Sequence, residues 1–209
     1  STTFIDRFLA GAEAYRVPVV LAFNKTDLYS EEEQALLRQT MALYEHIGYT
    51  CVALSVTHGT GIDVLSGMLR DKVTLLSGHS GAGESALINA LLPHLNVRTA
   101  AISAAHDTGM HTTTFSEMYA LPGGGAIIDT PGIKGFGTSY FDRREVGHYF
   151  REIFAASEDC RFGGGCTHTH EPGCAVRQAL IEGRIAASRF ASYLSVLEDQ
   201  DEGKYRAAH

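Results

Sequence analysis

Short runs of apolar and β-branched residues alternate with amphipathic stretches through roughly the first two thirds of the 209-residue chain. The apolar runs have the length of strands buried in a sheet, and the amphipathic stretches repeat their apolar positions with the period of a helix. This alternation predicts an α/β fold with a mostly parallel sheet. The predicted strands are residues 17–23, 50–55, 73–77, 115–121 and 126–129, and the predicted helices are residues 3–15, 31–47, 62–70, 85–91 and 143–156.

The pattern changes near residue 143, where the strand signal ends. A helix, a segment rich in Gly, Cys and His, and helical sequence from residue 175 follow. We therefore expect an α/β domain over residues 1–142 and a small α-helical domain over residues 143–209. Residues 96–114 show no clear period and are rich in Ser, Thr and His, so we expect a long functional loop there.

Composition narrows the class of protein. A hydrophobic fraction of 44% is enough for a buried core. The net charge of −7 argues against wrapping nucleic acid by charge alone, although local basic patches remain compatible with it. Because no apolar run reaches about 20 residues and no leader is visible, we expect a cytoplasmic protein without membrane contact. We also expect a monomer, and we interpret the chain, which starts at Ser1 within a predicted helix, as part of a longer protein.

The strongest local motif follows the predicted strand 73–77. Residues 78–85 match the phosphate-loop pattern G-x-x-x-x-G-K-[ST] at every fixed position except Glu84. In such a loop, backbone N–H groups and the end of the next helix bind phosphate, and the Ser85 hydroxyl suits Mg²⁺. A glycine-rich turn without a ligand is the alternative. The candidate phosphate-binding residues are Gly78, His79, Ser80, Gly81, Ala82, Gly83, Glu84 and Ser85.

Two further motifs close predicted strands. Residues 24–27 read N-K-T-D, in which the aspartate accepts two hydrogen bonds from guanine N1 and N2, a donor pair that adenine lacks. Residues 129–132 match D-x-x-G, where the carboxylate of Asp129 reaches Mg²⁺ through water and the N–H of Gly132 faces a γ-phosphate. A backbone contact with guanine O6 is expected after strand 50–55. The candidate guanine-binding residues are Asn24, Lys25, Asp27, Ser55 and Val56.

The guanine motif precedes the phosphate loop, whereas ordinary GTPases have the opposite order. A parallel sheet tolerates this circular permutation because all the site loops still leave the same edge. With residues 109–114 (G-M-H-T-T-T) and a Cys/His segment added, nearly the whole chain resembles the circularly permuted, small-subunit-dependent ribosomal GTPases of bacteria. The resemblance implies a circularly permuted P-loop GTPase domain with a helical zinc-binding domain.

The resemblance also implies chemistry and partners. It implies GTP or GDP, Mg²⁺ and Zn²⁺ as cofactors, and late assembly of the small ribosomal subunit, with its rRNA, as the process served. In that family the G-x-H-T-T-T segment closes over the γ-phosphate and Mg²⁺, so His111 is the candidate for positioning water. Ile133, where many GTPases have glutamine, is consistent with this role, although an exposed loop histidine is the alternative. The candidate switch threonines are Thr112, Thr113 and Thr114.

Two departures from the family pattern affect function. Glu84 replaces the phosphate-loop lysine and puts an anion beside the β- and γ-phosphates, so we expect weak triphosphate binding and hydrolysis. A natural pseudo-GTPase and an altered sequence both fit this residue. The family also has an oligonucleotide-binding barrel before the GTPase core; we do not expect that barrel within these 209 residues, and we therefore expect reduced RNA affinity.

Three cysteines and a histidine near the C-terminus have the residue types of a closed tetrahedral zinc site. The first two cysteines are separated by five residues, whereas the family more usually has four. His170 is a competing ligand, and Cys51 is expected in the core. Arginines and aromatics after residue 175 either face RNA or form a solvated helix with aromatics packed inward: Arg177, Arg184, Arg189, Phe190 and Tyr193. The candidate metal ligands are Cys160, Cys166, His168 and Cys174.

Three functions are compatible with these features. The first is a GTPase of ribosome assembly, impaired by Glu84. The second is a non-catalytic guanine-nucleotide-binding scaffold on the ribosome. The third is an RNA-binding zinc protein with the α/β part as support, for which the N-K-T-D motif would serve no purpose.

Overall fold

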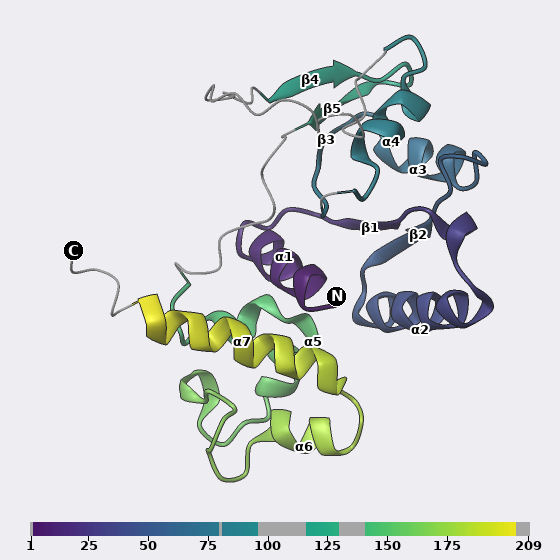
Figure 1. Cartoon of the computed structure of the whole chain (residues 1–209). Coiled ribbons are helices and arrows are strands. Elements are labelled where there is room, and N and C mark those ends of the chain that lie inside the picture. The colour runs from purple at the N-terminus through teal and green to yellow at the C-terminus, as the bar shows by residue number, and fades with distance from the viewer. Residues whose placement is uncertain (1, 80, 96–115, 130–140, 204–209) are drawn as a thin grey trace, which may run out of the picture. The chain divides into compact units, whose positions relative to one another are not determined.

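The computed structural model describes residues 2–79, 81–95, 116–129 and 141–203 (Figure 1). Among the helices within these ranges, none combines the length and the apolar character needed to cross a bilayer. The chain divides into two compact units. We call Val20–Lys134 the sheet unit, and Ser1–Val19 with Gly135–His209 the helical unit.

The sheet unit confirms the predicted α/β class. In the part of this unit that the structure describes, the strands form two sheets, one of two parallel strands and one of three strands in which a central strand pairs in parallel with one neighbour and antiparallel with the other. The strands are β1 (Val20–Phe23) beside β2 (Thr50–Ala53), and β5 (Gly125–Asp129) between β3 (Lys72–Leu76) and β4 (Glu117–Ala120).

Among the described residues, three α-helices accompany these strands, and each begins within a residue of its predicted start. They are α2 (Glu31–Ile47), α3 (Ile62–Leu69) and α4 (Glu84–Leu91). Helix α2 begins at a capping box, in which Ser30 accepts from the Glu33 N–H and Glu33 accepts from the Ser30 N–H. Helix α2 ends at Gly48, which is in the left-handed conformation. The core of this unit includes Leu54, Ile88 and Ile127, all fully buried.

The helical unit contains two longer helices, α1 (Thr2–Ala14) and α7 (Ala187–Gly203), and several short ones around its own core. The short ones are η3 (Val146–Tyr149), α5 (Arg151–Ser157), η4 (Gly163–Gly165) and α6 (Ala175–Ile181). The single helix predicted over 143–156 is wrong, because Phe150 is extended and divides it into η3 and α5. The Phe150 ring is fully buried and packs edge-on against Tyr193, so packing overrides local helical preference at this residue.

Helix α1 lies beside α7 in the helical unit (Figure 1). Leu9 and Ala10 of α1 are fully buried, and Ala10 belongs to the same core as Phe150. Two buried or half-buried ion pairs, Arg189 with Asp6 and Arg151 with Glu13, add to this packing. The structural division therefore differs from the expected boundary at residue 142, because α1 packs with helices far from it in sequence.

Candidate functional site

The loop after β1 contacts the loop after β3. The Lys25 ammonium donates to the carbonyl of Gly81 at 2.6 Å, and the Asn24 side-chain amide donates to the carbonyl of Ala82 at 3.1 Å. Both β1 and β3 end at these loops, as expected for a ligand site at the carboxyl edge of an α/β unit. The structure thus brings the two sequence-predicted loops together.

Asn24 also connects this pair of loops with the loop after β2. Its side-chain oxygen accepts from the Lys25 N–H at 2.8 Å and from the Val56 N–H at 3.4 Å. Thr26 donates to the Leu54 carbonyl twice, from its N–H at 3.1 Å and from its hydroxyl at 2.9 Å. The guanine motif is therefore held by hydrogen bonds between its own residues and backbone atoms of two neighbouring loops.

The carboxylate of Asp27 has two partners from the loop after β2. It accepts a hydrogen bond from the hydroxyl of buried Ser55, and its Oδ2 lies 3.8 Å from Nδ1 of His58. The Ser55 hydrogen bond, with His58 and Lys25 nearby, lowers the pKa of Asp27 below its ordinary value. Asp27 is therefore an ionised acceptor at neutral pH, the form that guanine recognition needs.

Sequence reasoning placed Ser55 here for a backbone contact and missed the role of its side chain. It also missed His58 entirely, because a histidine in an exposed turn has no distinguishing pattern. The proximity of His58 to Asp27 depends on the fold of the loop between β2 and α3.

The phosphate loop has the backbone geometry that its glycines predict. Gly81 and Gly83 have φ of +82° and +94°, in the left-handed region that favours glycine. A Cβ on Gly83 would lie 2.6 Å from the Asn24 side-chain nitrogen, so this close approach of the two loops requires glycine. Gly83 is also the N-cap of α4, whose first N–H groups therefore adjoin the loop.

Glu84 and Asp129 put two acids beside this loop. A Cβ on Gly78 would lie 3.3 Å from Oε1 of Glu84, so the carboxylate extends back over the start of the loop. Burial raises the pKa of Glu84, and Asp129 raises it further. Asp129 pairs in register with Leu76 at the end of β3. Its pKa is raised mainly by burial and further by the nearby charge of Glu117. The lysine cation of the phosphate-loop motif is thus replaced by the partly buried carboxylate of Glu84.

Several predicted site residues lie outside the described residues. They are Ser80 of the phosphate loop, the switch residues His111, Thr112, Thr113 and Thr114, and Gly132 of the D-x-x-G motif.

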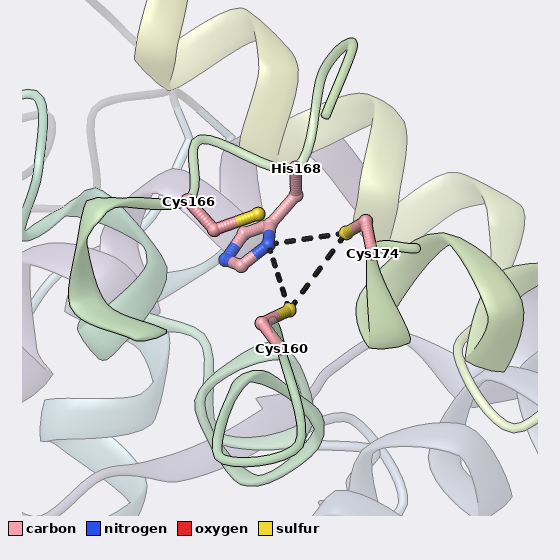
Figure 2. Close-up of side chains that lie close together, drawn as sticks. All are labelled: Cys160, Cys166, His168 and Cys174. Carbon is pink, nitrogen blue, oxygen red and sulfur yellow. Dashed lines mark hydrogen bonds between the residues drawn. The ribbon is translucent and has the colours of Figure 1, made fainter. Parts of the chain in front are cut away.

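A second candidate site lies in the helical unit, where Cys160, Cys166, His168 and Cys174 meet (Figure 2). Their ligand atoms all lie within 4.8 Å of one another, and all four residues are buried. Nδ1 of His168 lies 3.4 Å from the sulfur of Cys174 and 3.7 Å from that of Cys160, and these two sulfurs are 3.9 Å apart. Around a tetrahedral zinc ion with bonds of about 2.0–2.3 Å, ligand atoms are about 3.5–3.8 Å apart, so the cluster could hold such an ion.

The loop that carries His168 is held by Glu171. The carboxylate accepts from the N–H groups of Thr167 at 2.7 Å and Thr169 at 3.0 Å, on either side of the histidine. His168 itself has φ of +58°, an uncommon conformation outside glycine that these bonds stabilise. The hydroxyl of Tyr193 donates to the Thr167 carbonyl at 2.7 Å. The ligand loop is therefore positioned by the protein itself.

The structure distinguishes the two candidate histidine ligands. His168 is in the cluster, whereas His170 is exposed and outside it. Cys51 is also outside the cluster, on β2, with its sulfur 3.8 Å from the Met41 carbonyl. All four cysteines are free thiols.

The suggestion that the arginines and aromatics after residue 175 jointly face RNA is wrong for two of them. Arg189 is fully buried and Tyr193 is 1% exposed, because both pack in the core of the helical unit. Arg177 is exposed, and Arg184 forms an exposed ion pair with Glu182. The alternative, a helix with its aromatics packed inward, describes α7 better.

Known bacterial proteins are similar to this chain over its whole length. A protein of Bacteroides fragilis named small ribosomal subunit biogenesis GTPase RsgA is 60% identical over 209 residues, covering 100% of this chain and 67% of the relative. A protein of Porphyromonas gingivalis with the same name is 60% identical, covering 99% of this chain and 66% of the relative. The chain thus spans about two thirds of the length of the curated relatives it matches.

Solved structures have the same fold. The crystal structure of YjeQ from Thermotoga maritima matches with a TM-score of 0.81 and 32% identity, over 96% of this chain and 66% of that one. YloQ, described as a circularly permuted GTPase, matches with a TM-score of 0.78 and 27% identity, over 97% of this chain and 63% of that one. The predicted circular permutation is thereby confirmed.

A family model described as RsgA GTPase matches residues 1–139, which include α1 as well as the sheet unit. The permuted motif order, the meeting of the guanine and phosphate loops, and the high identity over the whole chain all agree with this match. The chain belongs to the RsgA GTPase family.

Proposed function

We propose that this chain binds GTP and GDP at the edge formed by the loops after β1, β2 and β3. Asp27 accepts from guanine N1 and N2, and residues 78–85 surround the phosphates. The observation that carries this proposal is the pair of hydrogen bonds from Asn24 and Lys25 to the carbonyls of the phosphate loop, because a single nucleotide must contact both loops at once. Ser55 and Val56 complete the base side.

The proposed reaction is hydrolysis of GTP. Mg²⁺ would be held by the Ser85 hydroxyl, a threonine among residues 112–114 and, through water, Asp129; hydroxyl and carboxylate oxygens are ligands that Mg²⁺ prefers. When bound, Mg²⁺ supplies positive charge to the β- and γ-phosphate oxygens. His111 would position the attacking water, and the N–H of Gly132 would bind the γ-phosphate.

The biological setting is taken from relatives whose names specify small ribosomal subunit biogenesis. We place this chain in the same process, in the cytoplasm, with the small subunit and its rRNA as partners. Zn²⁺ in the Cys₃His cluster would hold together the helical unit, because the cluster connects the segments before α6 with the core around Tyr193.

Glu84 sets the expected level of activity. A like-charge pair at 4 Å costs about 4 kcal/mol at an effective dielectric constant near 20, enough to weaken triphosphate binding severely. The position of the Glu84 carboxylate over Gly78 supports this expectation. It also favours a second candidate function, a guanine-nucleotide-dependent scaffold on the ribosome without turnover.

Phosphate release from GTP tests these two functions. We would measure it for the unmodified chain and for Glu84→Lys, each with and without small ribosomal subunits. Subunit-stimulated release by Glu84→Lys, with little or none by the unmodified chain, supports a GTPase impaired by Glu84. Equal release by the two proteins refutes the role given to Glu84, and no release by either under any condition refutes the hydrolase.

A further inference from the structure

The side chain of Ser55 has a complete set of partners. Its hydroxyl oxygen lies 3.2 Å from the N–H of His58 and 3.2 Å from Nδ1 of the same histidine, and the hydroxyl also bonds the Asp27 carboxylate. Ser55 is only 2% exposed, so water contributes little to these interactions. A hydroxyl has one donor and two acceptor positions, which equals the number of partners here.

The direction of each hydrogen bond follows from this count. An ionised carboxylate only accepts, so the single hydroxyl proton of Ser55 points to Asp27. The backbone N–H of His58 and its ring nitrogen Nδ1 must then both donate to the Ser55 oxygen. This arrangement requires a proton on Nδ1. The three groups therefore form a chain of hydrogen bonds in which His58 donates to Ser55 and Ser55 donates to Asp27.

The turn that carries His58 is fixed by its backbone. Ser55 and Thr60 exchange two backbone hydrogen bonds, at 3.1 and 3.0 Å, and the Gly59 N–H donates to the Val56 carbonyl at 3.3 Å. The imidazole is exposed, yet its Nδ1 is held at the buried hydroxyl. Its position is therefore set by the turn, and its contact with Ser55 is not a consequence of burial in a core.

From this geometry we infer that His58 is a positioning residue for guanine specificity: its Nδ1–H fixes the Ser55 hydroxyl, which in turn orients the Asp27 carboxylate toward guanine N1 and N2. The inference rests on the proposed nucleotide site. Without the Nδ1 donor, the Ser55 hydroxyl can rotate, and Asp27 loses a fixed partner. The bond to the guanine N2 amino group, which requires the second carboxylate oxygen, is the more sensitive of the two.

The test compares GDP with IDP, whose base lacks the N2 amino group. Dissociation constants are measured by calorimetry for the full chain and for Glu84→Lys, each with His58, His58→Ala or His58→Asn. Asn is chosen because its side-chain N–H₂ can replace the Nδ1 donor. His46→Ala, which removes an exposed histidine in the last turn of α2, is the matched control.

We expect His58→Ala to weaken GDP binding about fivefold, which is the effect of one hydrogen bond. The same variant should weaken IDP binding less than about twofold. His58→Asn should restore the GDP-to-IDP ratio, and His46→Ala should leave it unchanged. An equal loss for GDP and IDP, no loss for either, or failure of Asn to restore the ratio overturns the role of His58 while leaving the nucleotide site intact. If no protein of the series binds GDP, Glu84→Lys included, the proposed function fails and the inference with it.

Discussion

Nη1 of Arg189 lies 2.8 Å from Oδ1 of Asp6, so a salt bridge joins helices α7 and α1 across 183 positions of the chain. Both side chains are at most 1% exposed. The same guanidinium binds Glu152 of α5 through two further nitrogens, at 2.6 and 3.0 Å, and lies over the Phe150 ring. One buried cation thus holds three helices of the helical unit together.

Arg189→Ala should lower the free energy of unfolding by about 3–5 kcal/mol, because it removes the cation that compensates the buried carboxylate of Asp6 and the partly buried carboxylate of Glu152. The control is Arg184→Ala, which removes an exposed pair with Glu182 and should cost less than about 1 kcal/mol. Urea denaturation followed by circular dichroism measures both. Losses of similar size for the two variants would contradict the structural role of Arg189.

Arg189 also illustrates what the sequence did not reveal. Its neighbours in sequence suggested an exposed basic face, whereas its partners lie on α1 and α5, and nothing local indicates such distant pairing. Phe150 is a similar case, because core packing breaks a helix that periodicity predicts as continuous. By contrast, α2 was predicted at its observed bounds, since its limits depend on local signals such as Ser30 and Gly48.

The candidate sites also contain some features that the sequence predicts and others that only the structure reveals. The Cys₃His cluster and the meeting of the guanine and phosphate loops could be predicted, because residue types and motif order determine them. The partnership of Ser55 and His58 with Asp27 could not, since it depends on the path of a turn. The position of the Glu84 carboxylate over Gly78 likewise required coordinates.

Cys160→Ser should reduce the zinc content of the purified protein and destabilise the helical unit, because one of four buried ligands is lost. Cys51→Ser is the control, since Cys51 lies on β2 outside the cluster. Native mass spectrometry gives the metal content, and thermal melting with and without a chelator gives the stability. Equal zinc content in the two variants would be inconsistent with the cluster as the metal site.

Asp27→Asn should weaken GDP binding on the order of 100-fold, because the amide cannot accept two bonds as an ionised carboxylate does. XDP, in which a carbonyl replaces the guanine amino group, should gain affinity, since the Asn side-chain N–H₂ can donate to that oxygen. Competition against a fluorescent nucleotide, in the Glu84→Lys chain, measures both ligands. An unchanged preference for GDP over XDP would show that residue 27 does not contact the base edge.

The effect of Glu84 should depend on pH. Its pKa is raised above 4.5 by burial and by Asp129, so as pH falls it is protonated earlier than an exposed glutamate, and the anion beside the phosphates disappears. Asp27 stays ionised because its pKa is lowered. Because the pKa of Glu84 is raised in the folded protein, ionisation of this residue as pH rises lowers the stability of the folded state. Glu84→Gln should therefore not reduce stability at pH 7.

We therefore expect Glu84→Gln to bind GDP more tightly than the unmodified chain at about pH 7, and the ratio of the two affinities to fall toward one as the pH is lowered and Glu84 is protonated. Titrations in EDTA remove the contribution of Mg²⁺, and the ratio cancels protonation of GDP itself. Asp129, whose pKa is also raised, is present in both proteins, so its protonation largely cancels in the ratio as well. A ratio that stays constant or grows as pH falls would argue against this electrostatic explanation.

The most direct test of the account is a calorimetric titration of the unmodified chain and of Glu84→Lys with GDP and with ADP. Because Asp27 selects the base and residues 78–85 bind the phosphates, Glu84→Lys should bind GDP at least about tenfold more tightly than the unmodified chain, with no detectable ADP binding. Equal affinity for GDP and ADP, or no binding of either nucleotide by Glu84→Lys, would contradict a guanine-nucleotide site at this edge.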